Sequence, residues 1–281
     1  MSCCSVRLRS LVTAALAVVS VSCAVIADLP GGRLDPDASA GSGGTAGSAG
    51  NGGSTVSKYA AAVLSDNPVA YWRLGEKSAQ TAFDASPNGH HGKYLGGPAP
   101  AKPGAIVDDD DTAVLFADPS EVDAGNLFDF APDGTFTIEA WVKPTIEQNM
   151  FIGGKMAYDG SSHSGYFLIA NLSTAGGGLI SGYREPNAGY AQGGMLVVDQ
   201  FSHVAVTFDG TYVSVYQNGE KVGSNPLSMP NLPITAHAEP FRIAKGDDWN
   251  GFTGLIDEFA LYDYALGSRL LDHYRIGVGL E

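Results

Sequence analysis

One polar loop contains the combination of side chains that proteins use to bind sugars. Residues 246–251 read GDDWNG, so Trp249 stands among Asp247, Asp248 and Asn250. An aromatic ring covers the apolar face of a sugar, while carboxylates and amides bind its hydroxyl groups. We therefore predict that this loop contacts a ligand.

A second loop region, rich in glycine, contains two further aromatic candidates. They are Tyr183 and Tyr190, which lie 66 and 59 residues before Trp249 in the sequence. They are the second choice for ligand contact on the same chemical grounds.

Asp257 has the most informative position among the acidic residues. The alternation of Leu255, Asp257, Phe259 and Leu261 places its carboxylate on the apolar side of a strand, unless a bulge intervenes. A buried carboxylate needs a cation or several hydrogen bonds. Asp257 is therefore predicted to bind a metal ion or to accept backbone N–H groups.

Short strands must position these side chains. Residues 136–143 (FTIEAWVK) alternate, so Trp141 points away from the apolar face and lies on an outer surface or beneath a covering segment. Asn218-Gly219 matches a two-residue type I′ hairpin turn. The apolar face of this strand carries Phe136, Ile138, Ala140 and Val142.

The pattern of many short strands predicts an all-β fold. Turn signals separate the strands, and long amphipathic helices are absent from residues 57–281. These features favour two antiparallel sheets packed as a jelly-roll sandwich and disfavour a βαβ architecture. A brief helix is expected at residues 58–64, where Ala60, Ala61 and Ala62 favour it.

Composition excludes some classes of partner. The formal net charge is −14, which argues against nucleic acid, because nucleic acid selects for lysine and arginine patches. The run of aspartates at residues 108–111 is predicted to be a solvated loop, with a weak exposed cation site as the alternative. All cysteines lie within the first 23 residues, so the rest has no thiolate metal site or disulfide.

The N-terminal residues resemble an export signal. Arg7 and Arg9 precede a short apolar run, so residues 1–27 are predicted to be a signal peptide. Cleavage follows Ala27, or Cys23 is lipidated as in a bacterial lipobox, with Ser20 departing from that pattern. A lipid on Cys23 would be the chain's contact with a membrane.

Residues 28–56 are predicted to be a flexible linker. This stretch is rich in glycine, serine and alanine and can bury almost no apolar surface. With 29 residues its root-mean-square reach is about 30 Å, which suits a tether. An unanchored N-terminal extension is the alternative.

Six short segments follow one another in a recognisable order. They are 68–76 (PVAYWRLGE), 84–92 (DASPNGHHG), 136–143, 203–210 (HVAVTFDG), 215–219 (VYQNG) and 254–262 (GLIDEFALY). Together they resemble the laminin-G-like, or concanavalin A-like, jelly-roll family over about residues 60–277, although Pro87 replaces the glycine usual in the second segment. The resemblance implies a β-sandwich, but it does not specify a function, because relatives bind sugars, bind proteins or accompany enzymes.

The resemblance also implies a structural calcium site. Relatives place Ca²⁺ at an aspartate equivalent to Asp257, with oxygen ligands from the early loop, where Asp84 and Asn88 lie. Ligation by oxygen alone suits calcium. The alternative is that Asp257 accepts backbone N–H groups while Asp84 caps a turn.

Catalysis is not expected. Related glycosidases place paired carboxylates on one strand as Glu-x-Asp-x-x-Glu, a run that this sequence lacks. Glu139 stands alone on its strand, and the adjacent Asp257 and Glu258 should point to opposite faces. The predicted function is a non-catalytic binding module for a glycan. A structural or protein-interaction domain that contacts a cell-surface protein is the alternative, and a glycoside hydrolase is the least favoured.

Overall fold

The computed structural model describes residues 57–131, 134–172, 178–185, 189–227 and 237–280. The predicted signal peptide (1–27), the lipidation candidate Cys23 and the predicted linker (28–56) lie outside the described residues. They remain predictions.

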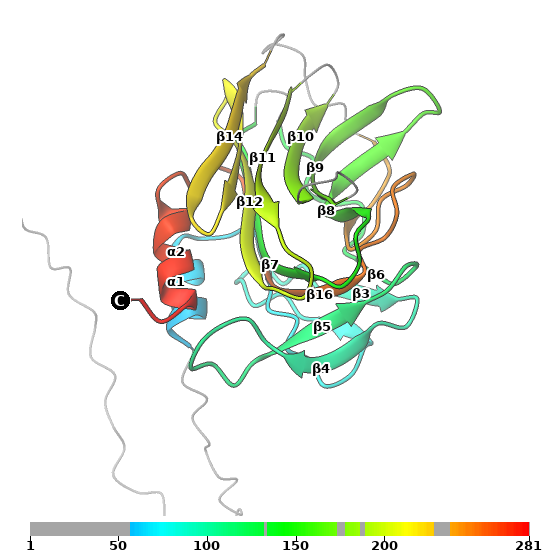
Figure 1. The fold of residues 1–281 in the computed structure, drawn as a ribbon. Helices are drawn as coiled ribbons and strands as arrows, with labels where there is room; N and C mark the ends of the chain where they lie inside the picture. The colour runs from blue at the N-terminus through cyan, green and yellow to red at the C-terminus, as the bar shows by residue number, and fades with distance from the viewer. Residues whose placement is uncertain (1–56, 132–133, 173–177, 186–188, 228–236, 281) are drawn as a thin grey trace, which may run out of the picture. The chain divides into compact units, whose positions relative to one another are not determined.

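Two antiparallel sheets of eight strands each form the sandwich that the sequence predicts (Figure 1). Sheet A has the order β14-β13-β12-β7-β16-β5-β4, and β1 also pairs with β16. Its strands are β14 (Glu220–Pro226), β13 (Tyr212–Gln217), β12 (Ser202–Phe208), β7 (Phe136–Pro144), β16 (Gly254–Tyr262), β5 (Thr112–Phe116), β4 (Ala99–Pro103) and β1 (Ala70–Trp72).

Sheet B has the order β11-β10-β9-β8-β15-β6-β3-β2. Its strands are β11 (Gly189–Leu196), β10 (Gly178–Glu185), β9 (His163–Asn171), β8 (Asn149–Tyr158), β15 (Phe241–Ile243), β6 (Glu121–Asp123), β3 (Gly92–Leu95) and β2 (Thr81–Ala82).

The inner faces of the two sheets form the main core. The alternation predicted for β7 is confirmed, because its apolar set lies in this core while Trp141 packs on the other side. The Asn218-Gly219 turn is also confirmed: both residues have positive φ, 53° and 79°, and join β13 to β14. A Cβ on Gly219 would lie 2.6 Å from the Cα of Leu271, so this glycine also lets a helix approach the turn.

Two short helices cover the outer face of sheet A. Figure 1 shows α1 (Lys58–Ser65) and α2 (Arg269–Gly277) together beside β12 and β14. The Ser57 side chain caps α1 by accepting the N–H of Ala60, which satisfies one of the unpaired donors of the first turn. Trp141 is buried beneath these helices and stacks on Tyr274, so it offers no ligand surface. Among the described residues no helix is long and apolar enough to cross a bilayer.

Strand β16 contains a bulge that corrects the predicted alternation. The pairing with β7 shifts between Asp257 and Ala260, and Glu258 adopts a φ of 52°. Ile256, Phe259 and Leu261 therefore face the main core. The predicted face had Leu255 and Asp257 in place of Ile256. The bulge also divides the partners of β16, since β5 pairs before it and β1 pairs after it.

Candidate functional site

Three aromatic side chains form a ladder across the outer face of sheet B. Tyr190, Tyr183 and Phe167 stand opposite one another on β11, β10 and β9, and this set is called the aromatic ladder below. Tyr183 and Tyr190 therefore lie on paired strands and not in the predicted loop, because both segments continue sheet B beyond β9. The rings of Phe167 and Tyr183 are 4.8 Å apart at 14°, and those of Tyr183 and Tyr190 are 5.7 Å apart at 21°. Tyr183 is thus stacked on both faces.

Tyr190 ends the ladder and is its most accessible member. Its residue surface is 43% exposed, whereas Phe167 is buried. No second ring stacks on Tyr190 among the described residues. The face of Tyr190 turned away from Tyr183 is therefore the best candidate for stacking on a sugar.

The Trp249 loop packs beside the ladder, against the apolar cluster beneath it. The Trp249 ring lies 6.5 Å from that of Tyr183 and 6.2 Å from that of His163, and it borders the apolar cluster formed with Phe167 and Ile169. Trp249 is half-buried, so part of its ring packs against the protein and part is open to a ligand. The predicted candidates Trp249, Tyr183 and Tyr190 are thus brought together, although their positions in the sequence are far apart.

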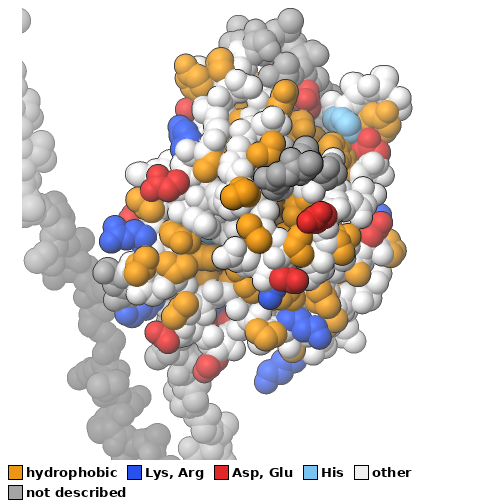
Figure 2. All heavy atoms as spheres, viewed as in Figure 1, with side chains coloured by type: hydrophobic (Ala, Val, Ile, Leu, Met, Phe, Trp, Pro, Cys, Tyr) orange, Lys and Arg blue, Asp and Glu red, His pale blue; other side chains and the backbone are white. Residues whose placement is uncertain are grey.

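Polar contacts hold the Trp249 loop in place. Arg242 donates to Asp247 at 2.6 Å, and His163 Nε2 lies 3.0 Å from both oxygens of Asp248. Asn250 donates to the carbonyl oxygen of Asn149 at 3.1 Å. Acidic side chains stand among apolar ones on the face that Figure 2 shows. The predicted polar residues of the loop thus border the aromatic surface.

Asp84 has a full set of hydrogen bonds inside the protein. Its Oδ1 accepts the N–H groups of Tyr71 and Ser86, both at 2.8 Å, and its Oδ2 accepts the Ser86 hydroxyl at 2.8 Å and the N–H of His90 at 2.7 Å. A carboxylate offers about four lone-pair sites, so these donors occupy all of them. This geometry favours the turn-capping alternative for Asp84.

The other two predicted calcium ligands also form hydrogen bonds within the protein. Asn88 uses its amide N–H to donate to the carbonyl of Val69, and Asp257 accepts the N–H of Ala105 at 2.7 Å. The described part of the chain holds no group of three or more His, Cys, Asp or Glu arranged for a metal. Calcium binding by Asp257, Asp84 and Asn88 stays a prediction.

Replacing Asp84 by alanine should lower the free energy of unfolding by about 3 kcal/mol, because four donors in a buried loop would lose their acceptor. Urea denaturation measures this change. Asp110→Ala, at an exposed aspartate, is the control and should shift stability by about 0.5 kcal/mol or less. A loss for Asp84→Ala no larger than that of the control would show that the loop does not depend on the carboxylate.

Asp257 and Glu258 lie on the same side of β16, contrary to the prediction of opposite faces. Asp257 accepts the N–H of Ala105 and Glu258 accepts the hydroxyl of Tyr71, and both partners belong to the apolar cluster under the helices. Burial and then the charge of Asp257 raise the pKa of Glu258 to about 8. Burial also raises the pKa of Asp257 to about 7, although the N–H of Ala105 opposes this. The bulge is the reason, since it breaks the two-residue period on which the prediction depended.

Arg73 gathers several acids beside this bulge. Its guanidinium lies 2.8 Å from Glu258, 2.7 Å from Asp109 and 2.8 Å from Asp111. Two aspartates of the acidic run are therefore tied to an arginine, which corrects the prediction that residues 108–111 form a solvated loop. Asp108 and Asp110 are exposed as expected.

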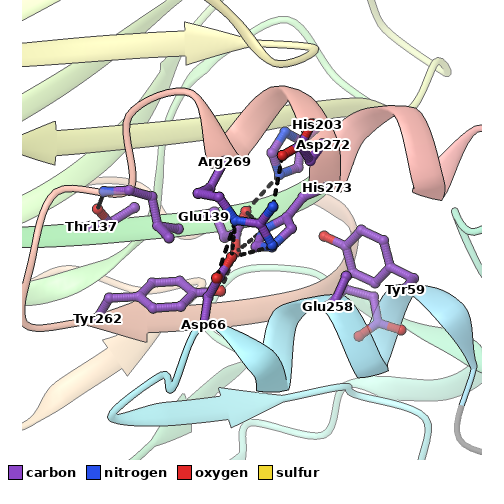
Figure 3. Close-up of polar contacts among 12 residues, drawn as sticks. Tyr59, Asp66, Thr137, Glu139, His203, Glu258, Tyr262, Arg269, Asp272 and His273 are labelled. Atoms are coloured by element: carbon purple, nitrogen blue, oxygen red, sulfur yellow. Dashed lines mark hydrogen bonds and ion pairs between the residues drawn. The ribbon is translucent and has the colours of Figure 1, made fainter.

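A second polar cluster lies under the two helices and was missed from the sequence (Figure 3). Buried Glu139 accepts from Tyr262 at 2.5 Å, contacts His203 Nε2 at 2.9 Å and contacts His273 Nδ1 at 3.0 Å. His273 Nε2 lies 3.0 Å from Asp66, so both ring nitrogens face carboxylates and both must donate. His273 is therefore an imidazolium that joins β7 of the sheet to α2 and to the end of α1.

The pKa values in this cluster agree with that charge state. Burial alone would lower the pKa of His273, but the charge and hydrogen bonding of Glu139 raise it above 6.5. Burial would raise the pKa of Glu139, but His273 and His203 hold it well below its usual value. Glu139, His203, His273 and Tyr262 are fully buried, so they dock the helices and offer no surface to a ligand.

The two antiparallel sheets form a concanavalin A-like β-sandwich. The chain belongs to the concanavalin A-like lectin/glucanases superfamily, whose sequence profile matches residues 110–269. No curated protein matches the sequence.

Several solved structures share this fold. Domain 4 of AbnA, a GH43 extracellular arabinanase from Geobacillus stearothermophilus, in complex with arabinotriose, is 20% identical with a TM-score of 0.54, over 74% of this chain and 98% of that one. The binding domain of Paraclostridial Mosquitocidal Protein 1 is 16% identical with a TM-score of 0.53, over 75% and 52%. Trypanosoma rangeli sialidase is 12% identical with a TM-score of 0.52, over 76% and 33%. At these identities the likeness shows the fold alone.

Proposed function

We propose that this protein is a non-catalytic, exported or envelope-tethered module that binds a carbohydrate at the aromatic ladder and the Trp249 loop. The observation that carries the proposal is the convergence of Tyr190, Tyr183 and Trp249 on one face, bordered by Asp247 and Asp248. The solved AbnA domain of the same fold, in complex with arabinotriose, supports a glycan as the ligand class. Its export and its tether rest on the signal peptide and linker predicted for residues 1–56.

Burial of the acidic clusters supports a non-catalytic role. Glycoside hydrolysis needs two carboxyl groups that reach the glycosidic bond. Glu139 and Glu258 are fully buried, and Asp257 is 1% exposed. None of the three can contact a polysaccharide without an opening of the fold.

Tyr190→Ala should weaken glycan binding by about tenfold or more, because Tyr190 offers the accessible ring of the ladder. Isothermal titration of the full chain with oligosaccharides selected by a glycan-array screen measures the affinity. Tyr212→Ala is the matched control, since Tyr212 is 44% exposed on sheet A. Its affinity should stay unchanged.

Equal affinities for the two variants would place the ligand elsewhere. Trp249→Ala should also reduce binding, but it removes packing from the cluster below, so it needs a parallel stability measurement. Tyr190→Phe should bind nearly as well as the wild type, because it keeps the ring.

A protein partner is the second candidate. Exposed apolar side chains next to the same edge strand favour it, with Met195 56% and Val197 46% exposed. Such side chains are common at protein interfaces. Two results together would favour a protein partner. No glycan would bind in the screen, and the chain would capture a cell-surface protein that the Met195→Lys variant fails to capture.

A further inference from the structure

We infer that the site selects neutral, hydroxyl-rich glycans and excludes glycans that carry carboxylates or sulfates. This inference rests on the proposed function and names the ligand class of the same site. It comes from the charges that border the aromatic ladder.

The first of these charges lie on the ladder and on the Trp249 loop. Glu185 lies two residues after Tyr183 on β10, in regular register with β9, so its side chain leaves the sheet on the same face as the ladder. Asp248 lies beside His163, whose ring is 6.2 Å from that of Trp249. An anionic ligand seated between Tyr190 and Trp249 would therefore approach fixed carboxylates.

The cations nearby are already neutralised by acids. Arg242 stands in the same cross-strand row as the ladder, separated from Phe167 by Gly154, and would be the natural partner for an acidic sugar. Its guanidinium contacts Asp247 at 2.6 Å, and two further carboxylates share it, from Glu239 at 3.2 Å and Glu121 at 3.5 Å.

Lys245 is likewise paired, with Asp118 at 3.3 Å. Together Arg242 and Lys245 face four carboxylates, namely those of Asp247, Glu239, Glu121 and Asp118.

The same carboxylates suit a neutral sugar. A carboxylate only accepts hydrogen bonds, and sugar hydroxyl groups donate them. An acidic sugar instead brings acceptors and negative charge, so it would lose these bonds and add repulsion. Because the groups are exposed or half-buried, salt should screen the repulsion.

The test compares matched oligosaccharides on the full chain by titration calorimetry at low salt. The matched probes are arabino- and cello-oligosaccharides with their sulfated forms, xylo-oligosaccharides with their glucuronate-substituted forms, galacto-oligosaccharides with oligogalacturonate, and lactose with sialyllactose. We expect at least one neutral probe to bind, with its acidic counterpart at least tenfold weaker. The ratio should shrink when salt is raised to about 0.5 M, where the screening length falls to a few ångströms.

A charge variant connects the selectivity to these side chains. Glu185→Gln together with Asp248→Asn should narrow the neutral-to-acidic ratio at least threefold, while Glu220→Gln on the exposed part of sheet A should leave it unchanged. An unchanged ratio in the double variant would overturn the inference.

The remaining outcomes separate the inference from the proposed function. An acidic probe that binds as tightly as its neutral counterpart overturns the inference and leaves glycan binding in place. A panel in which no probe of either class binds overturns both.

Discussion

Glu139→Ala should lower the free energy of unfolding by about 3–5 kcal/mol, which is the range for removing one member of a buried ion pair. Glu139 accepts from Tyr262 and contacts both His203 and His273. Without its carboxylate, the buried His273 imidazolium keeps only Asp66 as a partner. Urea denaturation followed by tryptophan fluorescence measures the loss, since Trp141 lies in the same cluster.

The pH dependence of this loss has a defined sign. Glu139 has a lowered folded pKa, so its contribution is present above its ordinary pKa of 4.5 and is lost as the pH falls through the folded value. His273 has a raised folded pKa, so its contribution is present below 6.5 and is lost as the pH rises through the folded value. The cost of Glu139→Ala should therefore be greatest between about pH 4.5 and 6.5.

Two further variants keep this prediction falsifiable. Glu139→Gln should cost less than alanine, because the amide oxygen still accepts a hydrogen bond. Glu220→Ala, at an exposed glutamate, should shift stability by about 0.5 kcal/mol or less. If Glu139→Ala matched Glu220→Ala at pH 5.5, the buried cluster would not be what holds α2 on sheet A.

Regular strands and local turns could be predicted from the sequence because their signals are local. The period of two in residues 136–143 identified the core face of β7, and Asn218-Gly219 identified a turn through its two positive φ angles. The family segments added the order of strands. The bulge at Glu258 was the exception, because a glutamate at a φ of 52° has no signature in the sequence.

The site residues depended on contacts between distant parts of the chain. Tyr183 and Trp249 were each chosen for their chemistry, but only strand pairing in sheet B shows that they share a surface. Glu139 seemed isolated because His203 and His273 follow it by 64 and 134 residues. One feature of the sequence could have indicated this cluster. Glu139 shares the outward face of its strand with Trp141, and such a large apolar side chain needs another segment packed over it.

Asp257→Asn should stabilise the protein at pH 8, by about 2 kcal/mol or more. Asp257 Oδ1 is buried and accepts no hydrogen bond from the described residues, and the carboxylate lies near those of Asp111 and Glu258. A rise in pKa from 3.8 to about 7 corresponds to at most about 4 kcal/mol of penalty for the charged form. Asparagine removes that charge and keeps an oxygen for the N–H of Ala105.

The sign of the pH dependence follows from the raised pKa. Between pH 3.8 and about 7 the folded state holds a proton on Asp257 that the unfolded state has released, so stability falls as the pH rises through this window. The variant should match the wild type near pH 4 and exceed it at pH 8, in urea denaturation. Asp110→Asn, at an exposed aspartate, should follow the wild type at both values.

Calcium binding at Asp257 would reverse the predicted order of stability of the wild type and Asp257→Asn. A bound Ca²⁺ would compensate the buried charge, so millimolar Ca²⁺ should then raise the melting temperature of the wild type at pH 8 and leave Asp257→Asn unchanged. Without binding, calcium should alter neither protein, and Asp257→Asn should remain the more stable one. A wild type that is more stable than Asp257→Asn after removal of calcium would contradict the charge argument, because the ionised carboxylate would then have a stabilising partner. The bulge that places Asp257 beside other acids thus either costs stability at neutral pH or creates a site that a cation must fill.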